Sequence, residues 1–221
     1  PAVSAAGAVL IRADTGALLF EKDAEKRLYP ASTTKIMTAL VVLEILEELS
    51  LGADSRVIVP AEAAGLEGSS IYLKAGEKVM MEELLYGMML QSGNDAATAA
   101  AICAGGNLCN FVARMNRKAE ELGCTGTHFV NPNGLHDPNH YSTAWDIYLF
   151  TREAMKNETF MKICGTASYV VPATNMSEER ELYTTNSLIS NWRIMGYQYD
   201  GADGIKTGST EESGYCLVSS A

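Results

Sequence analysis

Short apolar segments separated by turn residues lie near both ends of the chain. Residues 8–11 are apolar and partly β-branched, residues 13–16 have turn composition, and residues 17–20 are apolar again. This order predicts a β-hairpin. Near the other end, residues 169–171 and 214–219 are strand-like and predict further strands.

The middle of the chain has helical periodicity instead. One helix is predicted from Ala31 onward, because apolar residues recur at steps of three and four, namely Ile36, Met37, Leu40, Val41, Ile45 and Leu49. Further helices are predicted over residues 82–90, 96–103, 110–122 and 143–156. We expect Gly123 to cap the helix over 110–122, and Thr143 and Asp146 have the spacing of a capping box.

Strands at both ends around a helical middle predict an α/β (α+β) fold. We expect an antiparallel sheet from both chain termini, over about residues 1–60 and 165–221, with an inserted, mostly helical subdomain over about residues 61–164. Residues 1–221 would then form one domain with a cleft between the two parts. Clefts of this kind commonly hold active sites.

Composition narrows the function classes. With 221 residues, 47% of them hydrophobic, the chain can bury a substantial core. A formal net charge of −10 argues against a nucleic-acid partner, which requires a basic surface. No apolar run approaches the roughly 20 residues of a membrane-spanning helix. The chain does not begin like a signal peptide, so we expect a leader to have been removed or never present.

The cysteines give little guidance. Their number is odd and no C-x-x-C occurs, which disfavours zinc and thioredoxin-like sites. Most are expected to be buried free thiols, while a Cys103–Cys109 bridge and the redox compartment stay open. The five are Cys103, Cys109, Cys124, Cys164 and Cys216.

Ser32-Thr33-Thr34-Lys35 forms an S-x-x-K motif at the start of the first long predicted helix. Residues three apart share a helix face, so the Ser32 hydroxyl and the Lys35 amine can meet. A serine hydroxyl needs a base to become a nucleophile. A buried lysine near another cation has a lowered pKa and can supply that base. Alone, the motif is equally typical of a capping serine followed by a solvated lysine.

Ser92-Gly93-Asn94 lies between two predicted helices. Ser92 can pass a proton between a catalytic lysine and a leaving amine, and Asn94 can hold a substrate amide. Taken singly, the segment is better explained as an ordinary turn that caps a helix.

Lys206-Thr207-Gly208 lies on a predicted strand. Lys206 and Thr207 can hold a carboxylate, and Gly208 lets a peptide backbone approach closely. The alternative is a surface strand that ends in a turn glycine.

The conjunction of the three motifs, in this order, resembles the serine penicillin-recognising enzymes, which include β-lactamases and penicillin-binding proteins. Longer stretches are similar to the low-molecular-mass D-alanyl-D-alanine carboxypeptidases in particular. The resemblance covers nearly the whole chain and rests on residues 29–38, 91–96, 129–135, 141–143, 203–208 and 214–215.

This resemblance implies a β-lactamase/transpeptidase-like fold and a serine-type carboxypeptidase. Ser32 would attack the peptide carbonyl between two terminal D-alanines, with Lys35 as general base and Ser92 as proton relay. Backbone N–H groups of Ser32 and Ser209 would form the oxyanion hole. The other substrate-binding residues implied are Asn94, Lys206, Thr207 and Gly208.

The same resemblance implies the partners. The substrate would be a peptidoglycan stem peptide ending in D-Ala-D-Ala, and β-lactams would be inhibitors that acylate Ser32 and leave slowly. Neither a cofactor nor a metal is implied. An extracytoplasmic location, at the cell envelope, follows from the substrate.

The chain departs from the family pattern at its end. It stops at Ala221, in or just after the strand that follows the Lys206 motif. Family members continue through another strand and a closing helix, usually into a small β-domain and an amphipathic membrane anchor. An arginine that helps to bind the carboxylate lies in that further part. We therefore expect a fragment with a less complete sheet, and membrane contact only through an anchor absent from this chain.

Three other functions would leave different marks in the sequence. A related β-lactamase would need a deacylating glutamate, and Glu153 with Asn157 matches the string E-x-x-x-N, but both lie late on an amphipathic helix. A non-catalytic penicillin-sensing or wall-binding domain need not keep Ser92. A metalloprotease is excluded because Pro138 lies between His136 and His140 and would break the required helix.

Overall fold

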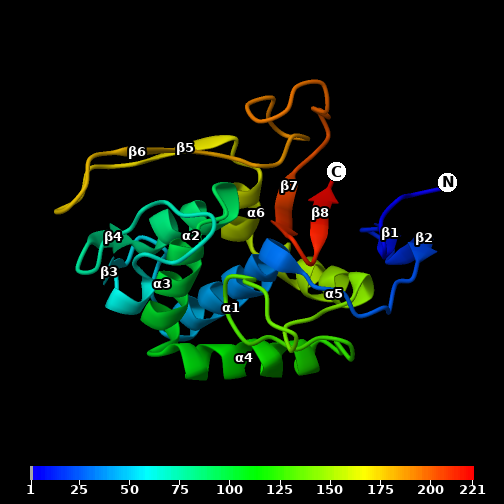
Figure 1. Cartoon of the computed structure of the whole chain (residues 1–221), viewed down its shortest axis with the longest axis horizontal. Helices are drawn as coiled ribbons and strands as arrows, with labels where there is room; N and C mark the ends of the chain where they lie inside the picture. The colour runs from blue at the N-terminus through cyan, green and yellow to red at the C-terminus, as the bar shows by residue number, and fades with distance from the viewer. Residues whose placement is uncertain (1) are drawn as a thin grey trace.

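The computed structural model describes residues 2–221, with helices at the centre and antiparallel hairpins around them (Figure 1). Helix α1 (Thr34–Glu48) lies in the middle, and nearly all of its residues are buried. It is preceded by the short 3-10 helix η1 (Ala31–Thr33). The predicted burial of Leu49 is wrong, because the helix ends one residue earlier and Leu49 is 60% exposed.

The remaining helices pack around α1, and four of them, α2 to α5, confirm the helices predicted from the sequence. They are α2 (Met81–Leu90), α3 (Asn94–Gly105), α4 (Leu108–Glu121), α5 (Ala144–Ala154) and α6 (Glu158–Cys164). Helix α6 was not predicted, because it is only two turns long; the Asn157 side chain caps it. Thr143 caps α5 by accepting from the Asp146 N–H, and Gly123 has a positive φ of 79° after α4.

The strands form four separate antiparallel pairs. The hairpin predicted at the N-terminus is present, with a bulge between Leu10 and Ile11. The pairs are β1 (Ala8–Arg12) with β2 (Ala17–Lys22), β3 (Arg56–Ile58) with β4 (Lys78–Met80), β5 (Ser168–Val171) with β6 (Arg180–Tyr183), and β7 (Gly204–Thr210) with β8 (Gly214–Ser220).

The α/β class with antiparallel strands is confirmed, but one sheet from both termini is not formed within residues 2–221. The hairpins β1–β2 and β7–β8 are each anchored by a different helical element instead of by each other. Strand β1 packs on α5, whereas β7 and β8 pack on η1. This second contact is the one that positions the site, because it brings the C-terminal hairpin against Ser32.

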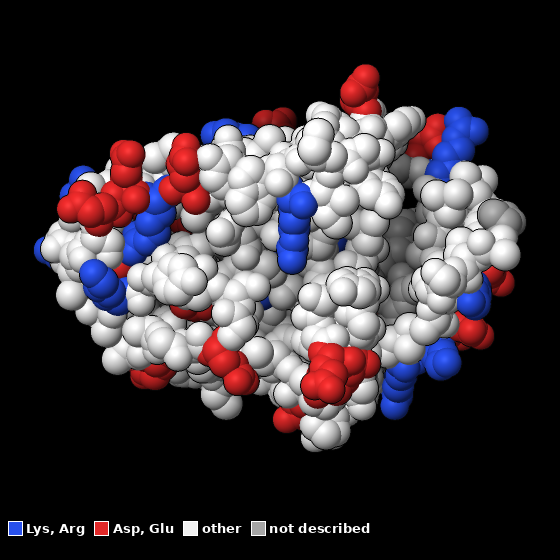
Figure 2. Space-filling model, turned by 45° about the horizontal axis from the view of Figure 1, so that its top comes forward, with Lys and Arg blue, Asp and Glu red and all other residues white. Residues whose placement is uncertain are grey.

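Charged side chains lie mainly toward the edges of the face drawn in Figure 2, and one basic side chain stands near its middle. A hollow of about 660 Å³ lies between β2 and Trp145, away from the three motifs. Within residues 2–221 no single helix is long and apolar enough to cross a membrane. Helices α3 and α4 taken together have the length and composition of a membrane span, but the angle between them is 89°.

Candidate active site

Three segments that are distant in the sequence meet beside the N-terminus of α1. Ser32 lies in η1 and Lys35 in the first turn of α1, so the predicted helix-start position is confirmed. Ser92 lies in the loop between α2 and α3, and Lys206 lies on β7, again as predicted. The Lys35 Nζ is 2.8 Å from Asn94 Oδ1, and the Lys206 Nζ is 3.0 Å from Ser92 Oγ.

The Lys35 amine is fully buried and has three oxygen neighbours. Its Nζ lies 3.0 Å from Ser32 Oγ, 2.8 Å from Asn94 Oδ1 and 2.6 Å from the Asn133 carbonyl oxygen. The amide and carbonyl oxygens can only accept hydrogen bonds. A neutral amine that donates its two hydrogens to them therefore has its lone pair left for the Ser32 hydroxyl.

Two causes favour the neutral form of this amine. Burial lowers the pKa of Lys35 well below its usual value, and the nearby Lys206 cation lowers it further, against the opposing effect of Asp95. Lys206 is therefore the second cation that the sequence analysis expected near Lys35.

Lys206 is itself buried and donates to Ser92 Oγ and to the Thr207 carbonyl. Burial lowers its pKa to about 7, with Cys164 opposing and Arg193 adding to the shift. Ser92 has a positive φ of 61°, a strained value for a residue other than glycine, of a kind found at functional sites. Within residues 2–221 Ser92 is hydrogen-bonded to Lys206 and not to Lys35 or Ser32.

Asn94 is fixed at both ends of its amide. Its Oδ1 accepts from Lys35, and its Nδ2 donates to the Glu67 carbonyl at 2.8 Å. The backbone N–H of Asn94 donates to the Ser69 carbonyl at 2.7 Å. One amide hydrogen of Asn94 is left for a further acceptor.

Residues 131–135 complete the site in a way that sequence reasoning missed. Asn133 supplies a backbone carbonyl to Lys35, and its side chain bonds Thr98 and the Leu135 N–H. Gly134 has a positive φ of 87°, and a Cβ there would lie 1.9 Å from the Ala31 oxygen. Every residue type has a carbonyl, so no side-chain signal could have revealed this contact.

Strand β7 approaches the candidate nucleophile closely. A Cβ on Gly208 would lie 2.9 Å from the Ser32 nitrogen, so only glycine leaves this approach unobstructed. Ser209 follows on the same strand. The Thr207 hydroxyl lies 2.5 Å from that of Thr185, a residue that the sequence did not single out.

Residues considered for other functions have structural roles. Glu153 on α5 pairs with Lys156, which follows this helix, and the Asn157 side chain caps α6, so both side chains have partners outside the site of the three motifs. His140 is 2% exposed; its Nδ1 accepts from the Val130 N–H and its Nε2 lies 2.8 Å from Thr34 Oγ1. Burial lowers the pKa of His140 to about 4.

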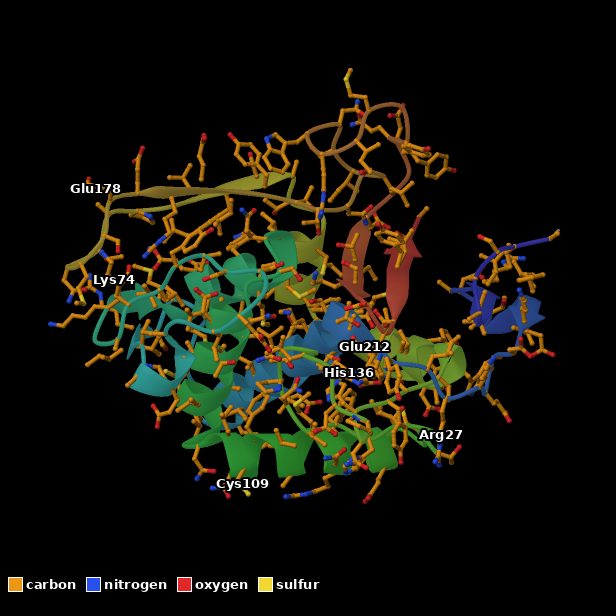
Figure 3. The ribbon with its side chains drawn as sticks, in the orientation of Figure 1. Arg27, Lys74, Cys109, His136, Glu178 and Glu212 are labelled. Carbon is orange, nitrogen blue, oxygen red and sulfur yellow. The ribbon has the colours of Figure 1, made fainter. Side chains whose placement is uncertain are left out.

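The periphery of the site can be followed in Figure 3. His136 and Glu212 lie near each other in this view, beside the turn between β7 and β8, while Arg27, Lys74, Cys109 and Glu178 lie at the edges of the molecule. His136 also contacts the Tyr29 ring edge-on, with ring centroids 4.6 Å apart.

Residues 2–221 contain no cluster of three or more His, Cys, Asp or Glu side chains that could hold a metal ion. All five cysteines are free, with Cys124 and Cys164 buried and Cys109 exposed. The contact between the Lys35 amine and Ser32 Oγ can support nucleophilic attack by a serine that a lysine activates.

Comparisons with known proteins agree with this arrangement. Residues 1–221 match the family described as D-alanyl-D-alanine carboxypeptidase. The chain is 41% identical over 217 residues to the D-alanyl-D-alanine carboxypeptidase DacF of Bacillus subtilis, covering 98% of this chain and 54% of that protein. It is 36% identical to the D-alanyl-D-alanine carboxypeptidase of Streptomyces sp. strain K15, covering 100% of this chain and 77% of that protein.

Among solved structures, the Streptomyces K15 DD-transpeptidase superposes with a TM-score of 0.88 at 35% identity, covering 99% of this chain and 85% of that one. This similarity confirms the transpeptidase-like fold. The chain spans about half the length of the Bacillus relative, 54%.

Proposed function

The chain belongs to the D-alanyl-D-alanine carboxypeptidase family, and we propose that it removes the terminal D-alanine from peptidoglycan stem peptides through an acyl-enzyme on Ser32. One observation carries this proposal. The Lys35 amine is buried, has a lowered pKa, and lies 3.0 Å from Ser32 Oγ with two acceptor-only oxygens on its other sides.

In the acylation step, Ser32 Oγ attacks the carbonyl carbon of the penultimate D-alanine while its proton moves to Lys35. The carbon–nitrogen bond then breaks: the departing D-alanine nitrogen takes the hydroxyl proton of Ser92, and Ser92 in turn takes the proton held by Lys35, which becomes neutral again. In deacylation, Lys35 accepts a proton from water, the water oxygen attacks the ester carbonyl, and Ser32 regains its proton. The sum is hydrolysis of one peptide bond.

The oxyanion that forms in each step would be held by the N–H groups of Ser32 and Ser209. The glycine at 208 supports this assignment, because it allows β7 to lie against the Ser32 nitrogen. Donors of this kind contribute about 3 to 4 kcal/mol to transition-state stabilisation in other enzymes.

Lys206 and Thr207 would hold the terminal carboxylate of the substrate, and Asn94 would use its free amide hydrogen for a substrate amide. A bound carboxylate favours the protonated form of Lys206, whose pKa without substrate is about 7. The residues of this part of the site are half-buried or buried, so the charges interact strongly.

β-Lactams would inhibit the protein by acylating Ser32, since they imitate the terminal dipeptide. The protein would act outside the cytoplasmic membrane, where its substrate lies. The division into a sheet part and a helical insert, over about residues 61–164, stays a prediction.

The test is incubation with benzylpenicillin, followed by intact-mass measurement over hours. We expect an adduct of one drug mass that persists, that is absent from Ser32→Ala, and that forms normally in the control Ser168→Ala, which changes an exposed strand serine. Release of D-alanine from a pentapeptide by the untreated protein is expected in parallel. Rapid loss of the adduct with continued drug consumption would identify a β-lactamase, and no adduct at all would refute the proposal.

A further inference from the structure

Thr185 lies beside the proposed carboxylate site without a role in the mechanism above. It follows β6 and begins the connection to β7, and its Oγ1 is 2.5 Å from the Oγ1 of Thr207. Among residues 2–221 neither hydroxyl has another side-chain hydrogen-bond partner. The two threonines are half-buried, so a ligand can reach them.

The backbone holds Thr185 firmly in this position. Its N–H donates to the carbonyl of Leu90, two residues before Ser92, at 3.1 Å. Its neighbours Thr184 and Asn186 are 4% and 2% exposed, and the Asn186 side chain reaches Ser219 on β8. Thr185 is therefore fixed between the C-terminal end of α2 and the C-terminal hairpin.

Proton counting in this pair has a direct consequence for carboxylate binding. Each hydroxyl has one hydrogen to donate. The Thr207 hydroxyl can donate its hydrogen to a carboxylate only if it accepts, and does not donate, in its hydrogen bond with Thr185. Thr185 must then be the donor. When Thr185 donates to Thr207 and Thr207 donates to a carboxylate, each hydrogen bond polarises the other and both become stronger.

We propose that Thr185 is a positioning residue, which donates its hydroxyl hydrogen to Thr207 and so directs the Thr207 hydrogen toward the terminal carboxylate of the substrate. This inference rests on the proposed function, because it assumes that Thr207 binds that carboxylate. Thr185 acts through Thr207 and not by contact with the reacting atoms.

Thr185→Val removes the hydroxyl and keeps the shape, and Thr185→Ser keeps the hydroxyl. The measurement is the second-order rate constant for acylation by benzylpenicillin and by its methyl ester, which lacks the free carboxylate. We expect Thr185→Val to slow acylation by the acid about tenfold, because it removes one hydrogen bond to Thr207, the residue that binds the charged carboxylate. The ester rate should change less than about twofold, and Thr185→Ser should restore the acid rate.

A double-mutant cycle identifies the route of the effect. Thr185→Val should add almost nothing to the loss caused by Thr207→Val, because the first hydroxyl acts only through the second. Equal slowing of acid and ester, or additive losses in the double variant, would overturn the inference while the proposed function stands. Absence of acylation in the unsubstituted protein would overturn both.

Discussion

Replacing Lys206 by methionine should flatten the rise in stability between pH 7 and pH 8.5. Lys206 is 1% exposed, and its pKa in the folded protein is about 7, against about 10.4 for an unperturbed lysine. Between these two values the unfolded chain binds more protons than the folded one. The free energy of unfolding therefore rises with pH in that window.

The magnitude follows from the two pKa values. One pKa unit corresponds to about 1.4 kcal/mol. From pH 7 to pH 8.5 the folded protein loses the remaining half proton on Lys206 while the unfolded chain keeps its proton. We expect this residue to contribute a rise of about 1.7 kcal/mol over that interval.

Urea denaturation followed by tryptophan fluorescence, at constant ionic strength, measures this rise. In Lys206→Met the rise should be smaller by about 1.7 kcal/mol, because the titrating group is gone. The control Lys162→Met changes an exposed lysine of α6 and should keep the full rise. Burial raises the pKa values of Cys124 and Cys164 to about 12, whereas unfolded thiols titrate at about pH 8.5, so these cysteines lower the free energy of unfolding toward the upper end of the window. Both proteins contain them, so their effect cancels in the comparison.

A rise in Lys206→Met equal to that of the unsubstituted protein would refute the reasoning. The same variant gives a second readout, because the Lys206 cation lowers the pKa of Lys35. Its removal should move the acid limb of Ser32 acylation by benzylpenicillin to higher pH. An acid limb that moved to lower pH would contradict the proposed electrostatic coupling.

Two further substitutions test the supports of the site. Gly134→Ala combines a φ of 87° with a Cβ 1.9 Å from the Ala31 oxygen, so it should cost more than about 3 kcal/mol of stability and slow acylation. Gly123→Ala, with a φ of 79° and open space, should cost about 1 kcal/mol and leave acylation unchanged. Thermal and urea denaturation measure these losses, and equal losses of stability in the two variants would contradict the reasoning. The folded pKa of His140, about 4, lies below its unfolded value of about 6.5, so its stabilising contribution is complete above pH 6.5 and is lost as pH falls toward 4. His140→Gln should reduce the loss of unfolding free energy between those pH values by about 3 kcal/mol, and an unchanged acid slope would show that another group is responsible.

Local interactions made much of the fold predictable. The N-terminal hairpin, the start of α1 near Ala31 and the capping of α5 by Thr143 depend on periodicity and on side chains a few residues apart, which the sequence displays directly. The S-x-x-K motif likewise predicted that Ser32 lies beside Lys35, because residues three apart share a helix face.

The exceptions depend on contacts between distant segments. Periodicity predicted one buried face for the first helix, yet α1 is buried on nearly all sides because other helices surround it. The terminal hairpins were expected to share a sheet, but each packs on a different helical element.

The sequence by itself therefore determined the local elements and the candidate chemical groups of this protein. Only the tertiary structure decided that Lys35 bonds the Asn133 carbonyl, that Ser92 pairs with Lys206, and that Thr185 reaches Thr207. The physical reason is that hydrogen-bond partners are chosen by packing. A backbone carbonyl or a threonine hydroxyl is chemically the same wherever it occurs, and its role follows from the element that brings it into the site.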